Sequence, residues 1–342
     1  MNFYNIYEKI QTAKELWLGT SSIYEKINLI KCVLYNLKPD FLKGKKVNFL
    51  PISATIYINT ICNYRCSFCF LINEDHTGSK SMNLDINGFK KIINNKFLGC
   101  APRITLGGGE PYLNKNIFDF IKILKEKKKI ISIYTNGSLI ERNYSNFFKY
   151  QPNYLNISHY DDKFDSLKSV FKKINNHNDK KFISRLSKII QSNKLDDMEK
   201  MILISIEHNF DRVIFQNYFP YKEKEKELVL YNDNIEFQNL KKLLSKKYKN
   251  KLKIVWPNLL EKKEVFRCNN ISINTTVDAN GNIAPCCFIT PPEKKNGNIF
   301  LEEINTWNSN SMMSFRSFLG KKKSPKECEN CYFKVGLSNR SF

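Results

Sequence analysis

The stretch that decides the fold reads Cys62-Asn63-Tyr64-Arg65-Cys66-Ser67-Phe68-Cys69, with three cysteines at the spacing C-x3-C-x2-C. It follows residues 54–59, a β-branched and aromatic run that predicts a strand. Three thiolates on one compact loop can hold three corners of a cubane iron–sulfur cluster, whereas full ligation takes four cysteines. One iron is then left open, as a catalytic metal site keeps a position free for a substrate or water.

A zinc knuckle or a set of buried thiols is the alternative for this loop. A structural zinc site takes four Cys or His ligands. Neither His76 nor Cys100 stands at a familiar spacing from the three cysteines. We therefore expect Cys62, Cys66 and Cys69 to bind a metal cluster.

Strands and helices alternate after the cysteine loop. The apolar patterns predict further strands at 104–106, 130–134, 154–158, 182–190 and 212–218, and helices at 86–94, 117–127, 166–174, 195–208 and 235–248. Repeated βα units of this size imply an α/β fold, with a parallel sheet and helices outside it. About six strands predict a partial (β/α)6 barrel of the TIM type, with its chemistry at the carboxyl ends of the strands.

Polar motifs stand at two of those strand ends. Gly107-Gly108-Gly109-Glu110-Pro111 follows the second strand, and Thr135-Asn136-Gly137 follows the third. Glycine has no Cβ atom, so the backbone at 107–109 can approach a cofactor closely. The alternative for both motifs is an ordinary tight turn, since Asn-Gly favours turns for conformational reasons alone.

The cysteine loop, with its aromatic Phe68, and the two polar motifs together resemble the radical S-adenosylmethionine superfamily over about residues 51–220. The glycine-rich motif is similar to the GGEP motif of that family. The resemblance implies a [4Fe–4S] cluster whose open iron chelates S-adenosylmethionine. One electron from the reduced cluster then cleaves this cofactor to methionine and a 5′-deoxyadenosyl radical, which abstracts hydrogen from an unactivated C–H bond. It also implies an electron donor such as flavodoxin or ferredoxin.

The same resemblance implies which residues contact S-adenosylmethionine. Glu110 would accept a hydrogen bond from the methionine ammonium group, and Ser158 and Arg185 would contact the ribose and the carboxylate. The other expected contacts are Phe68, Gly108, Gly109 and Asn136. The alternative for Arg185 is an ion pair that faces a helix.

A second group of cysteines lies near the end of the chain, and it comprises Cys268, Cys286, Cys328 and Cys331. Residues 271–277 and 283–289 are extended runs joined by Asp278-Ala279-Asn280-Gly281, and Asn-Gly is a strong hairpin signal. A helix at 304–319 precedes the last two cysteines. This part resembles the shortened auxiliary-cluster module called twitch, a relative of the SPASM module, which implies a fully ligated second [4Fe–4S] cluster. A four-cysteine zinc ribbon is the alternative.

Two further residues are candidates for catalysis. Cys287 stands next to Cys286 in an expected strand, where neighbouring side chains face opposite sides, so only one of them can readily be a ligand. Cys286 is the expected ligand, and Cys287 is either a hydrogen-atom donor or a core residue. His159 follows Ser158 at a strand end and either faces the active site or packs.

Composition limits the class of protein. The formal charge is +22, but the basic runs at 125–129 and 222–226 are interrupted by acidic residues, which favours solvated helix faces over nucleic-acid binding. No stretch reaches the roughly 20 apolar residues of a membrane span, and residues 1–10 contain no apolar signal-peptide region. We expect a cytoplasmic protein that does not bind membranes, with clustered cysteines used for metal rather than for disulfides.

Three regions are expected: a helical N-terminal extension at 1–50, the radical S-adenosylmethionine barrel at 51–258, and the auxiliary-cluster module at 259–342. Apolar residues recur at helical spacing in the extension at Ile23, Ile27, Ile30 and Leu34, with Cys32 off that stripe as an isolated packing or surface thiol.

The favoured function is an oxidoreductase or maturase that tailors a peptide or another natural product. A dehydrogenase or epimerase acting on a sugar or aminocyclitol is the alternative, because the spacings of the second cysteine group resemble those of an aminocyclitol dehydrogenase. A non-catalytic iron–sulfur or zinc protein that binds nucleic acid is the alternative from another class. The sequence does not identify the substrate.

Overall fold

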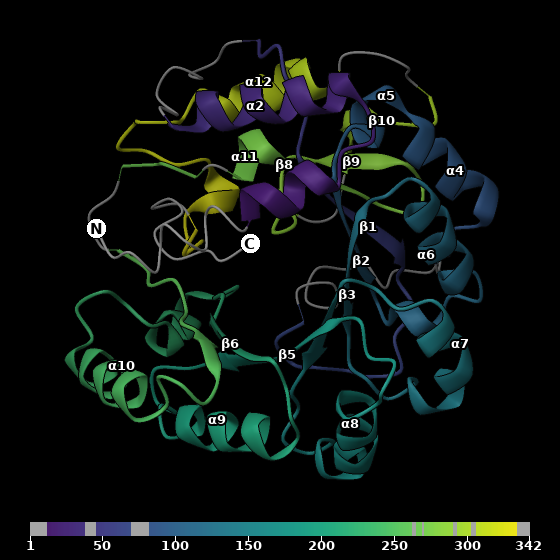
Figure 1. The fold of residues 1–342 in the computed structure, drawn as a ribbon. Coiled ribbons are helices and arrows are strands. Elements are labelled where there is room, and N and C mark those ends of the chain that lie inside the picture. The colour runs from purple at the N-terminus through teal and green to yellow at the C-terminus, as the bar shows by residue number, and fades with distance from the viewer. Residues whose placement is uncertain are drawn as a thin grey trace.

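One curved sheet runs through the protein in the computed structural model, which describes residues 12–37, 46–69, 82–261, 265–268, 270–289, 293–301 and 306–333. Ten strands in these described residues follow the order β10-β9-β8-β1-β2-β3-β4-β5-β6-β7. Figure 1 shows the strands around a central space, with an arc of helices outside them.

Seven consecutive parallel strands form the barrel wall. They are β1 (Ser53–Asn59), β2 (Arg103–Gly108), β3 (Ile130–Thr135), β4 (Tyr154–Ser158), β5 (Ile183–Ile190), β6 (Arg212–Asn217) and β7 (Lys253–Val255). The helices outside them include α4 (Ile86–Asn94), α6 (Ile117–Glu126), α7 (Tyr144–Lys149), α8 (Lys168–Asn175), α9 (Asp197–Glu207) and α10 (Ile235–Lys247). The predicted partial barrel is confirmed. Strand β7 was not predicted, because three residues give no periodic pattern.

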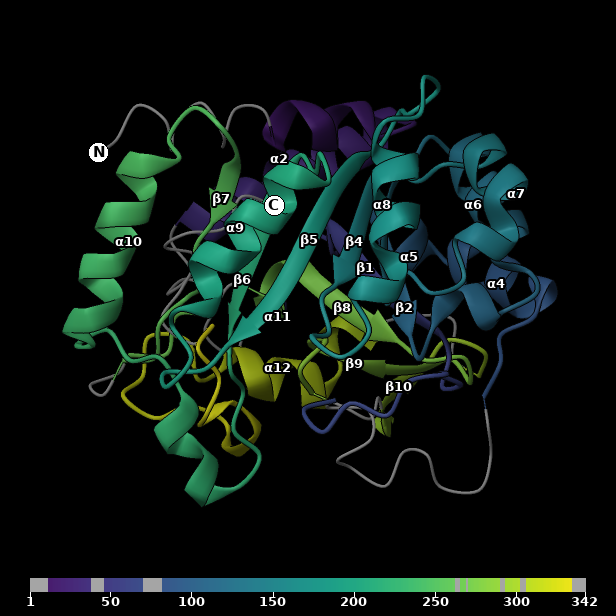
Figure 2. The same cartoon turned by 90° about the horizontal axis from the view of Figure 1, so that it is seen from below.

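The C-terminal strands extend this same sheet beyond β1. Strand β8 (Asn274–Val277) pairs in parallel with β1, and β9 (Asn282–Ala284) and β10 (Glu293–Asn298) follow as antiparallel neighbours. Figure 2 shows all three continuing from the β1 edge of the barrel. The predicted hairpin is confirmed, and it is part of the barrel sheet. The expected region boundary at 258/259 stays a prediction.

The predicted lengths of the C-terminal elements were wrong in part. Residues 270–273 form a helical turn, α11 (Asn270–Ile273), and β9 ends at Ala284 because Pro285 has no N–H for the strand ladder. Cys286 and Cys287 therefore lie beyond the strand, and the argument from opposite strand faces does not apply to them. Helix α12 (Asn310–Arg316) begins after Ser309, whose side chain accepts a hydrogen bond from the Met312 N–H.

The two faces of the barrel sheet differ in chemistry. On β1 the side chains of Ala54, Ile56 and Ile58 are fully buried in the apolar layer under the helices. On β6, residues 212, 214 and 216 are partly exposed while their neighbours are buried. Alternate strand residues face opposite sides, so these three line an inner space that solvent reaches. We call this space the lumen, its end at the carboxyl ends of the strands the mouth, and its other end the floor.

The N-terminal helices pack on this framework with only part of their apolar surface. Helix α2 (Ile23–Leu37) buries Leu29 and Cys32, and the Cys32 Sγ lies 4.0 Å from the Ser272 carbonyl oxygen. Cys32 is thus a packing thiol. The apolar positions predicted from helical spacing lie on the outer side, where Ile23 is 79% and Leu34 is 60% exposed. No helix within the described ranges has the length and apolar character needed to cross a bilayer.

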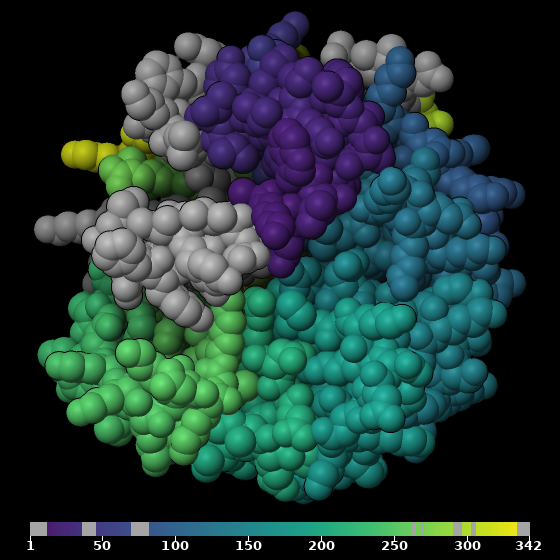
Figure 3. All heavy atoms as spheres, viewed as in Figure 1, coloured from purple at the N-terminus to yellow at the C-terminus, as the bar shows by residue number. Residues whose placement is uncertain are grey.

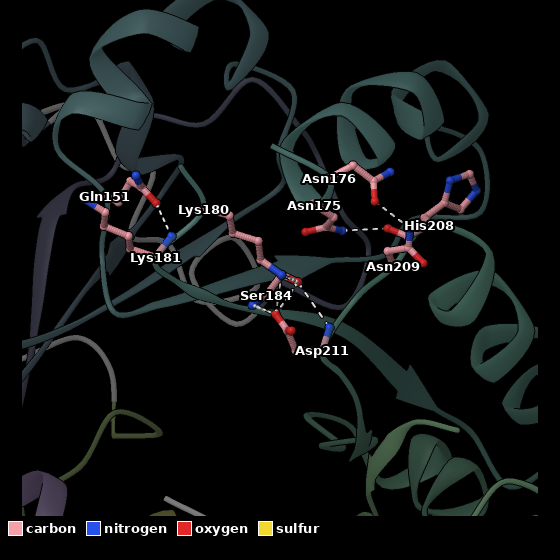
Figure 4. A network of polar contacts seen from close by, with 9 residues as sticks. All are labelled: Gln151, Asn175, Asn176, Lys180, Lys181, Ser184, His208, Asn209 and Asp211. Atoms are coloured by element: carbon pink, nitrogen blue, oxygen red, sulfur yellow. Dashed lines mark hydrogen bonds and ion pairs between the residues drawn. The ribbon is translucent and has the colours of Figure 1, made fainter. Parts of the chain in front are cut away.

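A polar network fixes the starts of β5 and β6 on the outer side of the sheet (Figure 4). The Asp211 carboxylate accepts hydrogen bonds from the Ser184 N–H at 2.7 Å and the Ser184 hydroxyl at 2.9 Å, and pairs with the Lys180 Nζ at 2.6 Å. Nearby, the Lys181 N–H donates to the Gln151 side chain at 2.7 Å. Because Ser184 and Asp211 are held outside, the next residue on each strand faces the lumen.

We expect Asp211→Ala to lower the free energy of unfolding by about 1–3 kcal/mol, because the buried Ser184 N–H loses its acceptor. Urea unfolding followed by circular dichroism measures this. The matched control is Asp165→Ala, which removes a surface ion pair with Lys168 and should leave the midpoint unchanged. Equal midpoints for the two variants would show that the network does not hold the strands.

Candidate active site

The three loop cysteines follow the carboxyl end of β1, at the mouth of the lumen. Each of Cys62, Cys66 and Cys69 is partly buried. The loop turns back on itself, since the Cys69 N–H donates to the Cys66 carbonyl at 3.1 Å. Burial raises the pKa of Cys62 and of Cys66. Glu110 and Cys69 raise the pKa of Cys62 further, and Cys69 and Cys62 raise that of Cys66. Thiols this close would repel as free thiolates, so the loop suits a cationic cluster that binds all three.

The glycine-rich motif is joined directly to the chain that leads into this loop. The Gly109 N–H donates to the Asn59 carbonyl at 2.9 Å, and the Glu110 N–H donates to the Ile61 carbonyl at 2.8 Å. A Cβ atom on Gly108 would lie 2.2 Å from the Asn59 carbonyl oxygen, and one on Gly109 would lie 2.0 Å from that of Ile61. Gly108 also has φ +121°. The absence of side chains therefore allows this contact with the backbone that leads into the cysteine loop. The predicted reason, a close approach of this backbone to the cofactor, stays a prediction.

Glu110 is the buried centre of the site. Its carboxylate accepts hydrogen bonds from the Thr135 hydroxyl at 2.7 Å, the Asn136 N–H at 2.8 Å and the Tyr112 N–H at 3.1 Å. Burial raises the pKa of Glu110 to about 7, against the lowering effect of these three bonds. A carboxylate offers about four acceptor positions, so one remains for a ligand donor such as an ammonium group.

The third predicted motif closes the ring of contacts. The Asn136 Nδ2 donates to the Asn63 side chain at 2.9 Å, and the Asn63 Nδ2 donates to the Ser138 hydroxyl at 2.9 Å. Asn63 belongs to the cysteine loop. The cysteine loop, the glycine-rich motif and the segment after β3 thus form one hydrogen-bonded unit, as expected for motifs at neighbouring strand ends.

Tyr160 is a site residue that the sequence analysis missed. Its hydroxyl hydrogen-bonds to the Cys66 thiol and to Ser158. Its ring stacks on Phe68 with centroids 6.0 Å apart and meets Tyr64 edge-on at 5.4 Å. Predicted residues Ser158 and Phe68 are therefore brought to the cysteine loop. Because alternate residues of a strand face the same side, Tyr160 would have been the better prediction than His159, which follows Ser158 directly.

His159 packs against an aromatic ring, and Arg185 stacks on Tyr154. The His159 ring packs on Phe164 with centroids 4.5 Å apart, and its Nδ1 lies 3.5 Å from Asp161. Burial lowers the pKa of His159 to about 4, and the charge of Lys188 lowers it further. The Arg185 guanidinium lies 3.9 Å from the ring centroid of Tyr154, at the start of β4. Tyr154 and Ser158 are the two ends of β4, and the expected contact of Arg185 with the cofactor stays a prediction.

The four C-terminal cysteines converge as predicted. Cys268, Cys286, Cys328 and Cys331 are all buried. Burial raises the pKa of Cys328, and the thiols of Cys331, Cys268 and Cys286 raise it further, in that order. The chain thus gathers four thiols from three separate segments, which is the donor set of a fully ligated cubane. In the part of the chain described, no three His, Cys, Asp or Glu side chains are placed around a single metal ion.

Two contacts connect the two thiol groups. The Tyr57 hydroxyl, from the inner face of β1, donates to the Cys287 carbonyl at 2.8 Å. Burial raises the pKa of Tyr57, and Cys287, Cys286, Tyr221 and Cys69 raise it further, so thiols from both groups lie near this ring. An apolar cluster of Tyr218, Val229, Leu260 and Tyr332 contacts both Phe68 of the cysteine loop and Phe288, which follows Cys286 and Cys287.

We expect Gly109→Ala to lower the melting temperature and to abolish iron binding at the cysteine loop, because the new Cβ would overlap the Ile61 backbone. Gly107→Ala is the matched control, since its Cβ would meet the Tyr57 ring only at 3.9 Å. Iron per chain after anaerobic reconstitution and thermal unfolding measure the difference. Retention of the same iron content by both variants would contradict the close-approach argument.

We expect the stability of the cofactor-free protein to fall as pH rises from about 4.5 to about 7, in part because of Glu110. The raised pKa of Glu110 means that the folded chain holds a proton in this window that the unfolded chain has released. Glu110→Gln removes this contribution and should flatten the fall in melting temperature. Exposed Glu141→Gln is the control, and an unchanged slope in the Glu110 variant would refute the assignment.

Comparisons with known proteins agree with this geometry. Residues 56–216 match the family model of the Radical SAM superfamily, and residues 268–332 match that of SPASM, an iron–sulfur cluster-binding domain. These families imply a [4Fe–4S] cluster, S-adenosylmethionine and an auxiliary iron–sulfur cluster, in place of the zinc alternatives. The three loop cysteines and the four C-terminal cysteines fall within the matched residues.

Individual curated proteins are similar to part of the chain. A GTP 3′,8-cyclase of Campylobacter jejuni is 32% identical over 101 residues, covering 29% of this chain and 30% of the relative. An S-adenosylmethionine-dependent nucleotide dehydratase of Fibrobacter is 31% identical over 100 residues, covering 28% and 30%. The chain thus spans about a third of the length of these curated relatives.

The crystal structure of Streptococcus suis SuiB bound to S-adenosylmethionine has the same fold. It superposes with a TM-score of 0.64 at 17% identity, over 85% of this chain and 73% of that one. The chain belongs to the radical SAM superfamily and carries a SPASM iron–sulfur cluster-binding domain after its barrel.

Proposed function

We propose that this protein is an oxidoreductase that abstracts hydrogen from a C–H bond of an organic substrate held in the lumen. The observation that carries the proposal is the placement of Tyr57 on the inner face of β1. Its hydroxyl donates to the Cys287 carbonyl, and the nearby Cys69 thiol raises its pKa. A substrate beside this ring would lie between the two thiol groups.

Cys62, Cys66 and Cys69 would hold the first cluster, and S-adenosylmethionine would bind at the iron they leave open. When bound, this pair supplies a 5′-deoxyadenosyl radical. Glu110 has an acceptor position left for the cofactor's ammonium group. The other residues proposed at the cofactor are Phe68, Gly108, Gly109, Asn136 and Ser158, to which the structure adds Tyr160 through its bond to the Cys66 thiol.

Cys268, Cys286, Cys328 and Cys331 would hold the auxiliary cluster, which supplies one-electron transfer near the substrate. Their burial excludes water from that site. The apolar cluster of Tyr218, Val229, Leu260 and Tyr332 packs against Phe68 of the cysteine loop and against Phe288 near Cys286. A soluble reductant such as flavodoxin or ferredoxin is proposed as the electron source, and the cytoplasm as the location.

For the substrate we propose a peptide or another natural product, as expected from the sequence. One observation favours the second candidate, a sugar-like small molecule oxidised or epimerised at carbon. The inner face of the barrel is polar along β4 and β5, where it presents Asn156, Ser158 and Ser187. The family matches support an enzyme over the non-catalytic nucleic-acid-binding alternative.

Anaerobic reconstitution tests the function and the ligand assignments together. The wild type should bind about eight irons, from two cubanes, and should release 5′-deoxyadenosine when given dithionite and S-adenosylmethionine. Cys66→Ala should lose about four irons and all cleavage, whereas Cys328→Ala should lose about four irons and keep cleavage. Cys100→Ala, a buried cysteine outside both groups, is the control. Full iron and cleavage in the Cys66 variant would refute the proposal.

A further inference from the structure

Asn270 is a buried residue whose side chain contacts one of the four C-terminal thiols. Its Nδ2 atom lies 3.8 Å from the Cys286 Sγ, within hydrogen-bond distance for a sulfur acceptor. The residue is only 4% exposed. It stands two positions after Cys268 in the sequence. Its side chain therefore links two of the segments that carry the proposed ligands of the auxiliary cluster.

The backbone of Asn270 is fixed by elements outside the thiol group. Asn270 is the first residue of α11, which leads directly into β8, and β8 pairs with β1. The Ile52 N–H donates to the Ile273 carbonyl at the end of α11, at 3.0 Å. On its other side α11 packs on α2, where the Cys32 Sγ lies 4.0 Å from the Ser272 carbonyl oxygen. The N-terminal residues, purple in Figure 3, lie on one face of the molecule, and α2 reaches α11 from there.

The segment that carries Cys286 is also fixed through its backbone. The Ile289 N–H donates to the Cys286 carbonyl at 3.1 Å, which closes a turn. The Tyr57 hydroxyl donates to the next carbonyl, that of Cys287, at 2.8 Å. Both partners of the contact between Asn270 and Cys286 are thus positioned by bonds that do not involve the thiol. The contact can persist when the thiol becomes a ligand.

The chemistry of a bound thiol decides the direction of this hydrogen bond. A cysteine that ligates iron is a thiolate and has no proton to donate, so the amide N–H of Asn270 is the donor. Reduction adds one negative charge to a cluster and its thiolates. Burial of all four cysteines disfavours that added charge, whereas an N–H donor at a ligand sulfur stabilises it. Hydrogen bonds to the sulfurs are among the factors that set the potential of an iron–sulfur cluster.

We propose that Asn270 is a positioning residue that raises the reduction potential of the auxiliary cluster through an N–H···S hydrogen bond to Cys286. The inference rests on the proposed function, which assigns Cys268, Cys286, Cys328 and Cys331 as the ligands. A raised potential favours the uptake of one electron at this site, which agrees with the electron transfer proposed there. The effect requires only the Asn270 amide and the Cys286 sulfur, so one substitution can remove it.

A redox titration followed by electron paramagnetic resonance tests the proposal on the full chain. Cys66→Ala serves as the parent, so that the signal comes from the auxiliary cluster alone. Asn270→Leu has a similar volume without the donor. It should lower the midpoint potential by about 59 mV, which is a tenfold change in the ratio of reduced to oxidised cluster for one electron. Asn274→Leu is the matched control, because Asn274 is also buried but makes no hydrogen bond to a thiol in the described part of the chain. It should titrate as the parent does.

Iron content, measured on the same samples, separates this inference from the proposed function. The parent and each variant should hold about four irons per chain. Four irons with an unchanged potential in Asn270→Leu would overturn the tuning role and leave the ligand set intact. Asn270→Ala removes the same donor without the bulk of leucine and should shift the potential in the same direction. Loss of iron from both Asn270 variants, with the Asn274 control intact, would also overturn the proposal, because it would show a structural role. A parent without iron would refute the ligand set, and the inference with it.

Discussion

The site depends on the close contact between the backbone of Gly108 and Gly109 and that of Asn59 and Ile61. Strand β2 and the chain after β1 stay within hydrogen-bond distance of each other past the end of their regular strand pairing. A Cβ atom at either glycine would prevent this approach. The contact places the Glu110 carboxylate under the cysteine loop. Three further contacts at the mouth follow, because Thr135, Asn136 and Tyr112 all donate to that carboxylate.

The Glu110 carboxylate is held by three hydrogen-bond donors, and its raised pKa means that a bound cation would stabilise its ionised form. The three hydrogen bonds fix its position, whereas its burial disfavours the ionised form. A bound cation restores the balance, since it favours ionisation and occupies the remaining acceptor position.

Much of this could be predicted from the sequence, for identifiable reasons. Cysteine spacing, the strand ends and the glycine-rich motif are local signals, and they were enough to predict the barrel and its iron–sulfur cofactors. Strand β7 was too short to show a period. The stretch at 271–277 was misassigned because a helical turn and a strand share the same apolar composition. Tyr160 was missed because its role comes from Cys66, a residue distant in the chain.

The auxiliary module is the clearest case where tertiary pairing decides the chemistry. Its thiols come from three segments, and strand β8 holds them in place by pairing with β1, the same strand that leads into the first cysteine loop. A shift of β8 by one residue against β1 would turn every side chain to the other face and would move Cys268 and Cys286 relative to the lumen. Tyr57 lies on β1 at this junction and bonds to the Cys287 carbonyl. The β1–β8 strand pair is therefore one of the contacts that fix the C-terminal cysteines relative to the cysteine loop.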